Sequence, residues 1–225
     1  MDKNGTTWTN YDNQEFYETL SLEDFKKFAA CAGLTAYSDL RAIDEYIKPS
    51  KSILEIGAGF GRVIDYLLKN YPAKSVVGIE SCQKLFDFLT RKYKANSQVR
   101  ILKQDIHSLK IDLKQDLILW MWSGVADFSP LEQTIILKNL KAILSDQGVL
   151  IVDTISPNRT PVGMEKQEPQ VFLLNYHGST IHTYSLTNEE IDTYAQELLL
   201  KVKHLDYITT TGRIRSLHIF TKILV

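Results

Sequence analysis

Apolar residues in this chain occur in short continuous runs that alternate with stretches in which every third or fourth residue is apolar. The runs predict buried strands, and the stretches between them predict amphipathic helices that pack on those strands. Five such strands are expected in the first two thirds of the chain, at residues 53–56, 75–80, 99–103, 116–122 and 149–155. Because continuous apolar strands are typical of parallel sheets covered on both faces, the alternation predicts a doubly wound α/β sheet with right-handed crossovers.

Capping residues mark where several helices begin. A serine or threonine followed three residues later by an acid caps a helix, because each side chain binds the backbone N–H of the other residue. Such pairs begin the helices predicted after Ser21, Ser129 and Thr187. Gly33 is expected to end the first of these helices. A further helix is expected over residues 38–47.

The alternation stops after the fifth strand. Residues 156–170 contain three prolines and a glycine, and they predict a loop. Two strands are then expected at 171–177 and 180–186, joined by the two-residue turn Gly178-Ser179. This β-hairpin is an insertion in the α/β pattern. Its turn predicts two cross-strand pairs, Asn175 with His182 and Leu173 with Tyr184.

The last part of the chain predicts a helix followed by strands at 204–209 and 216–224. The short turn around Gly212 makes these two strands antiparallel. The expected fold is therefore a mostly parallel, doubly wound α/β sheet with a C-terminal antiparallel hairpin and an inserted β-hairpin after the fifth strand. Its length predicts a single domain, 1–225. We divide it into a helical N-terminal segment that could act as a lid, a cofactor-binding core, the inserted loop and hairpin, and a C-terminal helix with two strands, at 1–48, 49–156, 157–187 and 188–225.

Composition narrows the choice of partners. The formal net charge is −1, so no basic field favours a nucleic-acid substrate, and a small molecule is the expected acceptor. Cys31 and Cys82 lack metal-ligand spacing and predict reduced thiols. The sequence shows neither a signal-peptide pattern nor an apolar run of membrane-spanning length. A cytoplasmic protein without a membrane contact is therefore expected, and its oligomeric state stays open.

The most informative stretch is SILEIGAGFGR, from Ser52 to Arg62. It predicts a strand, a tight turn and a helix, and three alternate glycines allow positive φ and the close approach of a ligand. A dinucleotide-binding loop has the spacing G-x-G-x-x-G, whereas the spacing here is G-x-G-x-G. Glu55 precedes the first glycine by two residues, where its carboxylate would oppose a pyrophosphate but attract an ammonium group. The stretch therefore favours a cofactor that carries an amino acid.

A hydrophobic residue followed by E-x-G-x-G-x-G resembles the first motif of the class I S-adenosylmethionine-dependent methyltransferases. The resemblance covers residues 50–155 motif by motif, and the closing antiparallel strands match the way the sheet of that family ends. It implies S-adenosylmethionine as cofactor and S-adenosylhomocysteine as product, with an acceptor that the sequence does not identify. Two alternatives stay open. One is an NAD(P)-dependent oxidoreductase, which the glycine spacing and Glu55 disfavour, and the other is a non-catalytic module with the same fold.

An acid at the end of the second strand is expected to bind the ribose. Glu80 lies 23 residues after the first glycine, where a carboxylate can accept both ribose hydroxyl protons. By the resemblance, Asp105 binds the adenine amino group and Ile106 packs on the ring. An aromatic residue of the N-terminal segment, Tyr11 or Tyr17, would close over the site. The predicted cofactor-binding residues are Tyr11, Glu55, Gly57, Ala58, Gly59, Gly61, Arg62, Glu80, Ser81, Gln104, Asp105, Ile106 and Trp120.

No catalytic residue is assigned, because methyl transfer requires a general base only when the acceptor must lose a proton. His182 and Tyr184 on the hairpin are candidates, although both also fit a strand by propensity alone. Residues 120–123 are expected either to belong to the core or to line the methyl-transfer site. The sequence contains no metal-ligand motif, and no metal is expected. Further candidates for a base are His177, Tyr176 and Asp153.

Overall fold

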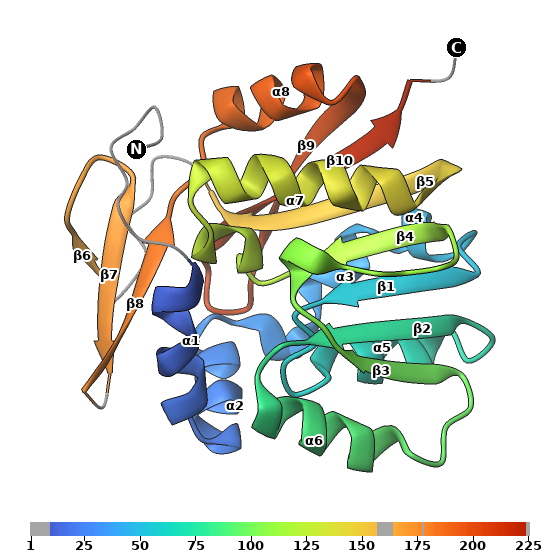
Figure 1. Cartoon of the computed structure of the whole chain (residues 1–225), viewed down its shortest axis with the longest axis horizontal. Coiled ribbons are helices and arrows are strands. Elements are labelled where there is room, and N and C mark those ends of the chain that lie inside the picture. The colour runs from blue at the N-terminus through green and yellow to red at the C-terminus, as the bar shows by residue number, and fades with distance from the viewer. Residues whose placement is uncertain (1–9, 157–163, 177, 224–225) are drawn as a thin grey trace.

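The computed structural model describes residues 10–156, 164–176 and 178–223, and the side chains of residues 10–12 are not described. The strands of its central sheet are β1 (Ser52–Ile56), β2 (Ser75–Glu80), β3 (Val99–Lys103), β4 (Gln115–Trp120), β5 (Leu144–Ile155), β9 (Leu200–Ile208) and β10 (Ile214–Lys222). They form a seven-stranded sheet in the order β3-β2-β1-β4-β5-β10-β9 (Figure 1). The first five strands are parallel, and β10 is antiparallel to both β5 and β9. The predicted fold class is confirmed.

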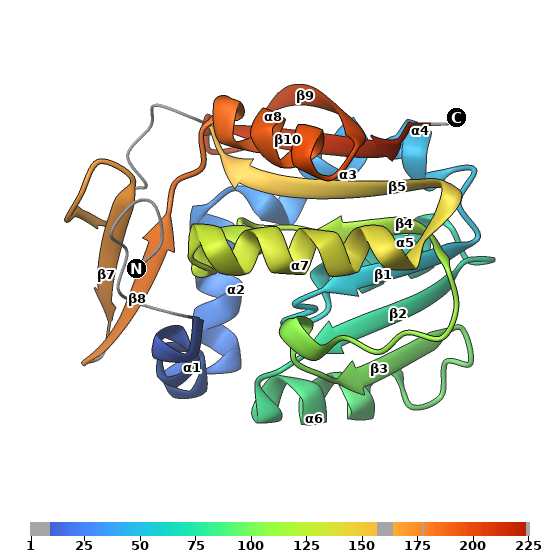
Figure 2. The same cartoon turned by 45° about the horizontal axis from the view of Figure 1, so that its top comes forward.

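Helices cover both faces of this sheet (Figure 2). The α-helices are α1 (Asn10–Thr19), α2 (Leu22–Cys31), α3 (Ser38–Ala42), α4 (Asp44–Ile47), α5 (Arg62–Asn70), α6 (Gln83–Tyr93), α7 (Pro130–Ile143) and α8 (Asn188–Glu197), and the 3₁₀ helices are η1 (Leu34–Ala36), η2 (Ile106–Ser108) and η3 (Gly124–Asp127). One buried apolar cluster packs α7 and α8 on the sheet, and a second packs α3, α4, α5 and α6 on the opposite face. These helices therefore meet the sheet in two cores, and a third apolar cluster joins α1, α2 and α6 to Ile181.

The predicted helix starts are confirmed, because capping boxes are present at Ser21, Ser129 and Thr187. The single helix predicted over residues 38–47 is wrong in one respect. Ile43 has a φ of −112°, which interrupts the helix and separates α3 from α4. Ile43 is nevertheless fully buried, so the interruption does not change which face of the segment packs on the sheet.

Most strand boundaries lie within two residues of the predicted ones, and β4 ends at Trp120 instead of residue 122, but two strands begin much earlier than predicted. β5 begins at Leu144 instead of residue 149, and an irregularity in its pairing with β4 accommodates the additional residues. β9 begins at Leu200, directly after Leu199, which has a φ of +50° and redirects the chain out of α8. Leu199 is 69% exposed, so it does not belong to the buried face that α8 packs on the sheet.

The inserted segment forms a separate three-stranded sheet in the order β6-β7-β8, made of β6 (Glu165–Lys166), β7 (Val171–Tyr176) and β8 (Ser179–Tyr184). Its predicted register is wrong. Ser179 already pairs with Tyr176, so the two-residue turn lies one position earlier than expected, with Gly178 at a φ of +82° as its second residue. The observed pairs are Asn175 with Thr180, Leu173 with His182 and Val171 with Tyr184.

The N-terminal helices determine which part of the sheet is covered. α1 and α2 lie across the carboxyl ends of the parallel strands, between these ends and the inserted sheet (Figures 1 and 2). Ligands of open α/β sheets bind outside the carboxyl ends of the strands. The candidate site is therefore enclosed by elements from both ends of the sequence.

Candidate active site

Three glycines in the left-handed region build the turn between β1 and α5. φ is +67° at Gly57, +57° at Gly59 and +82° at Gly61, so a residue with a Cβ atom would be strained at each position. A Cβ at Gly57 would meet no neighbouring atom within 4 Å, and one at Gly59 would come no closer than 3.9 Å. A Cβ at Gly61 would collide with the Tyr93 hydroxyl. The first two glycines thus face open space, whereas Gly61 is required for packing against α6.

Glu80, the last residue of β2, holds this turn in place. Its Oε2 accepts the backbone N–H of Gly59 at 2.8 Å, and its Oε1 accepts the backbone N–H of Cys82 at 2.9 Å. Burial raises the pKa of Glu80 to about 7, although these N–H groups act in the opposite direction. Its neighbour Ser81 is exposed. Each carboxylate oxygen can accept more than one hydrogen bond, so Glu80 can hold the turn and still accept hydroxyl donors.

Glu55, near the end of β1, is buried, and its Oε2 has no hydrogen-bond partner among the described residues. Burial raises the pKa of Glu55 well above its usual range, and the positive charge of Arg62 opposes this rise. The other charged groups that act on Glu55 are acidic: Glu80, Asp65 and Asp39. A buried carboxylate with an unpaired oxygen gains free energy from a cationic partner. The electrostatics of this position fit an ammonium group.

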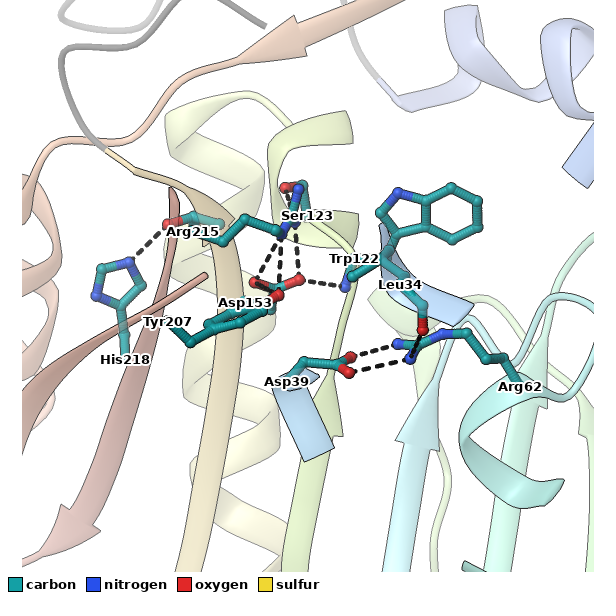
Figure 3. A network of polar contacts seen from close by, with 10 residues as sticks. Leu34, Asp39, Arg62, Trp122, Ser123, Asp153, Tyr207, Arg215 and His218 are labelled. Atoms are coloured by element: carbon teal, nitrogen blue, oxygen red, sulfur yellow. Dashed lines mark hydrogen bonds and ion pairs between the residues drawn. The ribbon is translucent and has the colours of Figure 1, made fainter. Parts of the chain in front are cut away.

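Arg62, the first residue of α5, is bonded to the N-terminal part of the chain (Figure 3). Its Nη1 donates to Asp39 Oδ1 at 3.1 Å and to the Leu34 carbonyl at 3.2 Å, and its Nη2 donates to Asp39 Oδ2 at 2.5 Å. Both side chains of the ion pair are buried. The pair therefore ties η1 and α3 to the glycine turn, and a direct contact of Arg62 with a cofactor stays a prediction.

The segment after β3 contains a chain of polar contacts that the sequence did not indicate. Asp105 Oδ1 accepts the backbone N–H of His107 and lies 2.8 Å from its Nδ1. His107 Nε2 lies 3.2 Å from Glu132 Oε1. Ile106 is buried, and the side chain of Gln104 is bonded to the backbone six residues further on. Asp105 is thus oriented by a histidine that bridges two carboxylates.

Trp120 at the end of β4 was expected to be either core or a wall of the site. The structure places it in the core, where it is 2% exposed and makes an edge-to-face contact with Phe128 at a centroid distance of 5.5 Å. A Cβ at Gly124 would collide with the indole nitrogen of Trp120. Core packing therefore accounts for this side chain.

The two residues that follow Met121 have unusual backbone conformations. φ is +55° at Trp122 and +58° at Ser123, although neither is a glycine. Asp153 Oδ2 accepts the Trp122 N–H at 2.8 Å, and Arg215 Nη2 donates to Ser123 Oγ and to Asp153 Oδ2, each at 2.7 Å (Figure 3). Tyr207 donates to the same carboxylate at 3.1 Å. Asp153, a candidate base by sequence, thus holds a strained turn, and the Trp122 indole points away from this network.

The helix α1 is attached to both sides of the site. Asn13, which is fully buried, accepts the backbone N–H of His182 at 2.8 Å and donates to the His182 carbonyl at 2.9 Å and the Asp127 carbonyl at 3.1 Å. The Tyr17 hydroxyl donates to the Asp127 carboxylate, whose pKa is raised to about 7 by desolvation. Tyr17 therefore lies at the covered site, while the side chain of Tyr11 lies outside the described residues.

The residues of the hairpin that were predicted as candidate bases lie in different environments. The Tyr184 hydroxyl donates to Glu190 Oε1 at 2.6 Å, and the side chain is only 1% exposed. The Tyr176 hydroxyl donates to Asp24 at 3.0 Å. His182 contributes its backbone to the contact with α1, and His177 lies outside the described residues. A catalytic role for His182 or Tyr184 stays a prediction.

The described residues contain no group of three or more side chains that could hold a metal ion. Within the same part of the chain, no helix is both long and apolar enough to cross a membrane.

Residues 53–148 match the family described as "Methyltransferase domain". These residues are therefore similar to the methyltransferase family. The chain has the fold of an S-adenosylmethionine-dependent methyltransferase from Clostridium acetobutylicum ATCC 824, with a TM-score of 0.66 at 16% identity over 88% of this chain and 98% of that chain. The 1,6-didemethyltoxoflavin-N1-methyltransferase of Burkholderia thailandensis has a TM-score of 0.71 at 13% identity, over 98% of this chain and 93% of that chain. The predicted resemblance to class I methyltransferases is confirmed.

The chain is also similar to "Ribosomal RNA small subunit methyltransferase A" of Malacoplasma penetrans strain HF-2. The two sequences are 28% identical over 145 residues, which is 63% of this chain and 51% of the relative. The chain spans between about a fifth and a half of the length of the curated relatives it matches.

Proposed function

We propose that this chain binds S-adenosylmethionine at the carboxyl ends of β1, β2 and β3 and transfers its methyl group to an acceptor. The observation that carries the proposal is the buried Glu55 carboxylate, whose Oε2 has no partner among the described residues, next to a turn with open space at Gly57 and Gly59. A sulfonium cofactor with an amino-acid part fits both features, because its ammonium group would pair with Glu55. Glu80 would accept the ribose hydroxyls, and Asp105 the adenine amino group.

When bound, the cofactor supplies an electrophilic methyl group, and the chain aligns the acceptor with it. The residues nearest to the acceptor would come from the turn after β4, from α1 and from β8, because these three elements meet at Asn13 and Asp127. Asp127 and Tyr17 form a hydrogen-bonded pair there. If the acceptor must lose a proton, Asp127 has a pKa suited to that role near neutral pH.

The acceptor we infer is a small molecule. Two observations support this inference: α1 covers the carboxyl ends of the strands, and a net charge of −1 gives no general attraction for a polyanion. The similar structure from Burkholderia thailandensis holds 1,6-didemethyltoxoflavin, a small molecule, together with S-adenosylhomocysteine. Ribosomal RNA is the alternative, and the name of the relative from Malacoplasma penetrans is the finding that favours it.

Isothermal titration calorimetry with S-adenosylhomocysteine and with NADH tests the cofactor. We expect binding of the first ligand alone, and a large loss of affinity in Glu55→Gln. Binding of NADH, or of neither ligand, would contradict the proposal. Tritiated S-adenosylmethionine, offered with a low-molecular-weight metabolite extract or with small-subunit ribosomal RNA, tests the acceptor. Label incorporated into the RNA fraction would replace the small-molecule inference.

A further inference from the structure

Three buried charges lie behind the glycine turn: Glu55 on β1, Arg62 on α5 and Asp39 on α3. Asp39 is fully buried, and the exposed fractions of Glu55 and Arg62 are 3% and 6%. Arg62 supplies the positive charge among the charged groups that dominate the pKa of Glu55. Whether Arg62 pairs with Asp39 or with Glu55 therefore decides whether the Glu55 carboxyl group is left without a cationic partner.

Arg62 is bound to Asp39 and not to Glu55. Its two terminal nitrogens donate to the two oxygens of Asp39, which is the bidentate geometry that a guanidinium group prefers (Figure 3). Its Nη1 also donates to the Leu34 carbonyl. Glu55 Oε2, by contrast, has no partner in the described part of the chain. The ion pair keeps the guanidinium occupied beside a carboxylate that it could otherwise neutralise.

The charge balance around Glu55 depends on Asp39. With Asp39 present, Arg62 is neutralised, so an ammonium group that binds beside Glu55 becomes the cation that favours the charged form of this buried carboxyl group. Without Asp39, Arg62 would balance Glu55 and repel an ammonium group. Two other acids act on Glu55, but Asp65 is paired with Lys92 at 2.5 Å. The second of them, Glu80, binds backbone N–H groups of the turn.

We propose that Asp39 is a positioning residue for the cofactor: by holding Arg62, it keeps the Glu55 carboxylate available to the ammonium group of S-adenosylmethionine. This inference rests on the proposed function, since it takes the ammonium group to bind at Glu55. It gives the N-terminal segment a function in cofactor binding that does not depend on closing over the site. In this proposal Arg62 binds Asp39 and does not contact the ligand, although the sequence predicts Arg62 to be a cofactor-binding residue.

Two ligands distinguish this role from a merely structural one. S-adenosylhomocysteine carries the ammonium group, and methylthioadenosine has the same nucleoside without the amino-acid part. The ratio of their dissociation constants, measured by calorimetry, reports the binding of the amino-acid part, which carries the ammonium group, separately from that of the nucleoside. In Asp39→Asn we expect this preference for S-adenosylhomocysteine to fall by about 10- to 100-fold, the range for weakening a hydrogen bond between charged groups, with methylthioadenosine affinity changed by less than about twofold.

A double variant makes the test sharper. Asp39→Leu with Arg62→Met removes both charges and leaves Glu55 unneutralised, so the preference should return to that of the wild type. A structural role predicts that the double variant is as impaired as the single one, and that result would overturn the inference. If Asp39→Asn does not fold, as judged by circular dichroism, the Arg62→Met variant tests the inference by itself. Its preference should equal or exceed that of the wild type, and a fall would mean that Arg62 itself binds the ligand.

Glu45→Gln is the matched control, because it removes one negative charge from the neighbouring helix α4, where the side chain is 65% exposed. Its ligand preference should not change. Glu55→Gln separates the two proposals. If the wild type binds S-adenosylhomocysteine and Glu55→Gln loses the preference while Asp39→Asn keeps it, the inference about Asp39 fails and the proposed function stands. If the wild type shows no preference, both fail.

Discussion

Replacing Glu80 by glutamine is expected to shift the stability difference between variant and wild type in favour of the variant as the pH rises, while it weakens cofactor binding. Burial raises the Glu80 pKa from 4.5 to about 7. Between these values the folded protein binds more protons than the unfolded chain, so the free energy of unfolding falls as the pH rises. The stabilisation is complete below pH 4.5 and is lost as the pH rises through 7. This interval corresponds to about 3 kcal/mol.

Glutamine has the shape of the protonated side chain and does not titrate. The difference in unfolding free energy between Glu80→Gln and the wild type should therefore shift in favour of the variant by up to about 3 kcal/mol between pH 4.5 and about pH 8. The affinity for S-adenosylhomocysteine should change in the opposite direction, by about 10-fold or more, because one amide oxygen replaces a charged acceptor of two ribose hydroxyls. Glu80 would then cost stability near neutral pH in exchange for ligand binding.

Urea denaturation over a pH series, together with calorimetry of ligand binding, measures both effects. Glu45→Gln serves as the control, because it makes the same substitution at a side chain that is 65% exposed. A stability difference between Glu80→Gln and the wild type that is the same at acidic and alkaline pH would refute the reasoning. In that case Glu80 would ionise in its ordinary range, and its bonds to Gly59 and Cys82 would outweigh the effect of burial.

Two further predictions concern the turn and the closing strands. Gly59→Ala should reduce stability by only about 1–2 kcal/mol, the cost of a left-handed residue, but should weaken S-adenosylhomocysteine binding; Gly61→Ala should mainly reduce stability, because its Cβ would collide with Tyr93. Urea melts and calorimetry on both variants would contradict this if the two substitutions affected binding equally. His218 is fully buried, and burial, with His204 beside it, lowers its pKa to about 3. As the pH falls, His218 therefore binds a proton in the unfolded chain before it does so in the folded protein. The free energy of unfolding should then fall by about 2 kcal/mol from pH 6.5 to about pH 5. His218→Asn should remove this decrease in a series of urea melts at different pH values. An equal decrease in both proteins would count against the assignment.

The elements that local pattern determines were predicted from the sequence. β2 and β3 begin and end at the predicted residues, because their apolar runs are bounded by polar residues on both sides. The hairpin register was predicted incorrectly, since Gly178 suits either position of a two-residue turn, and moving the turn by one residue changes every cross-strand pair. The interruption at Ile43 likewise has no signal in the apolar spacing, which continues unchanged through it.

The residues of the candidate site likewise fall into those that the sequence predicted and those that it missed. Glu55, Glu80 and the glycines could be found because they lie in one motif or at the end of a recognisable strand. The residues that fix the surrounding loops were missed, because their partners are distant in sequence: Asp39 lies 23 residues from Arg62, and Asp153 lies 62 residues from Arg215. No local pattern distinguishes such an acid from one that is exposed to solvent.

This division explains why the sequence indicates a cofactor but not an acceptor. The cofactor half of the site is built from consecutive strand ends, and its chemistry is readable from short motifs. The acceptor half that we propose is organised by Asn13, which binds both the N–H and the carbonyl of His182, 169 residues away, and so aligns α1 with the inserted sheet as a neighbouring strand would. Such a contact is compatible with many side chains around it. The acceptor half can therefore change its specificity through α1 and β8 while the residues proposed to hold the cofactor remain the same.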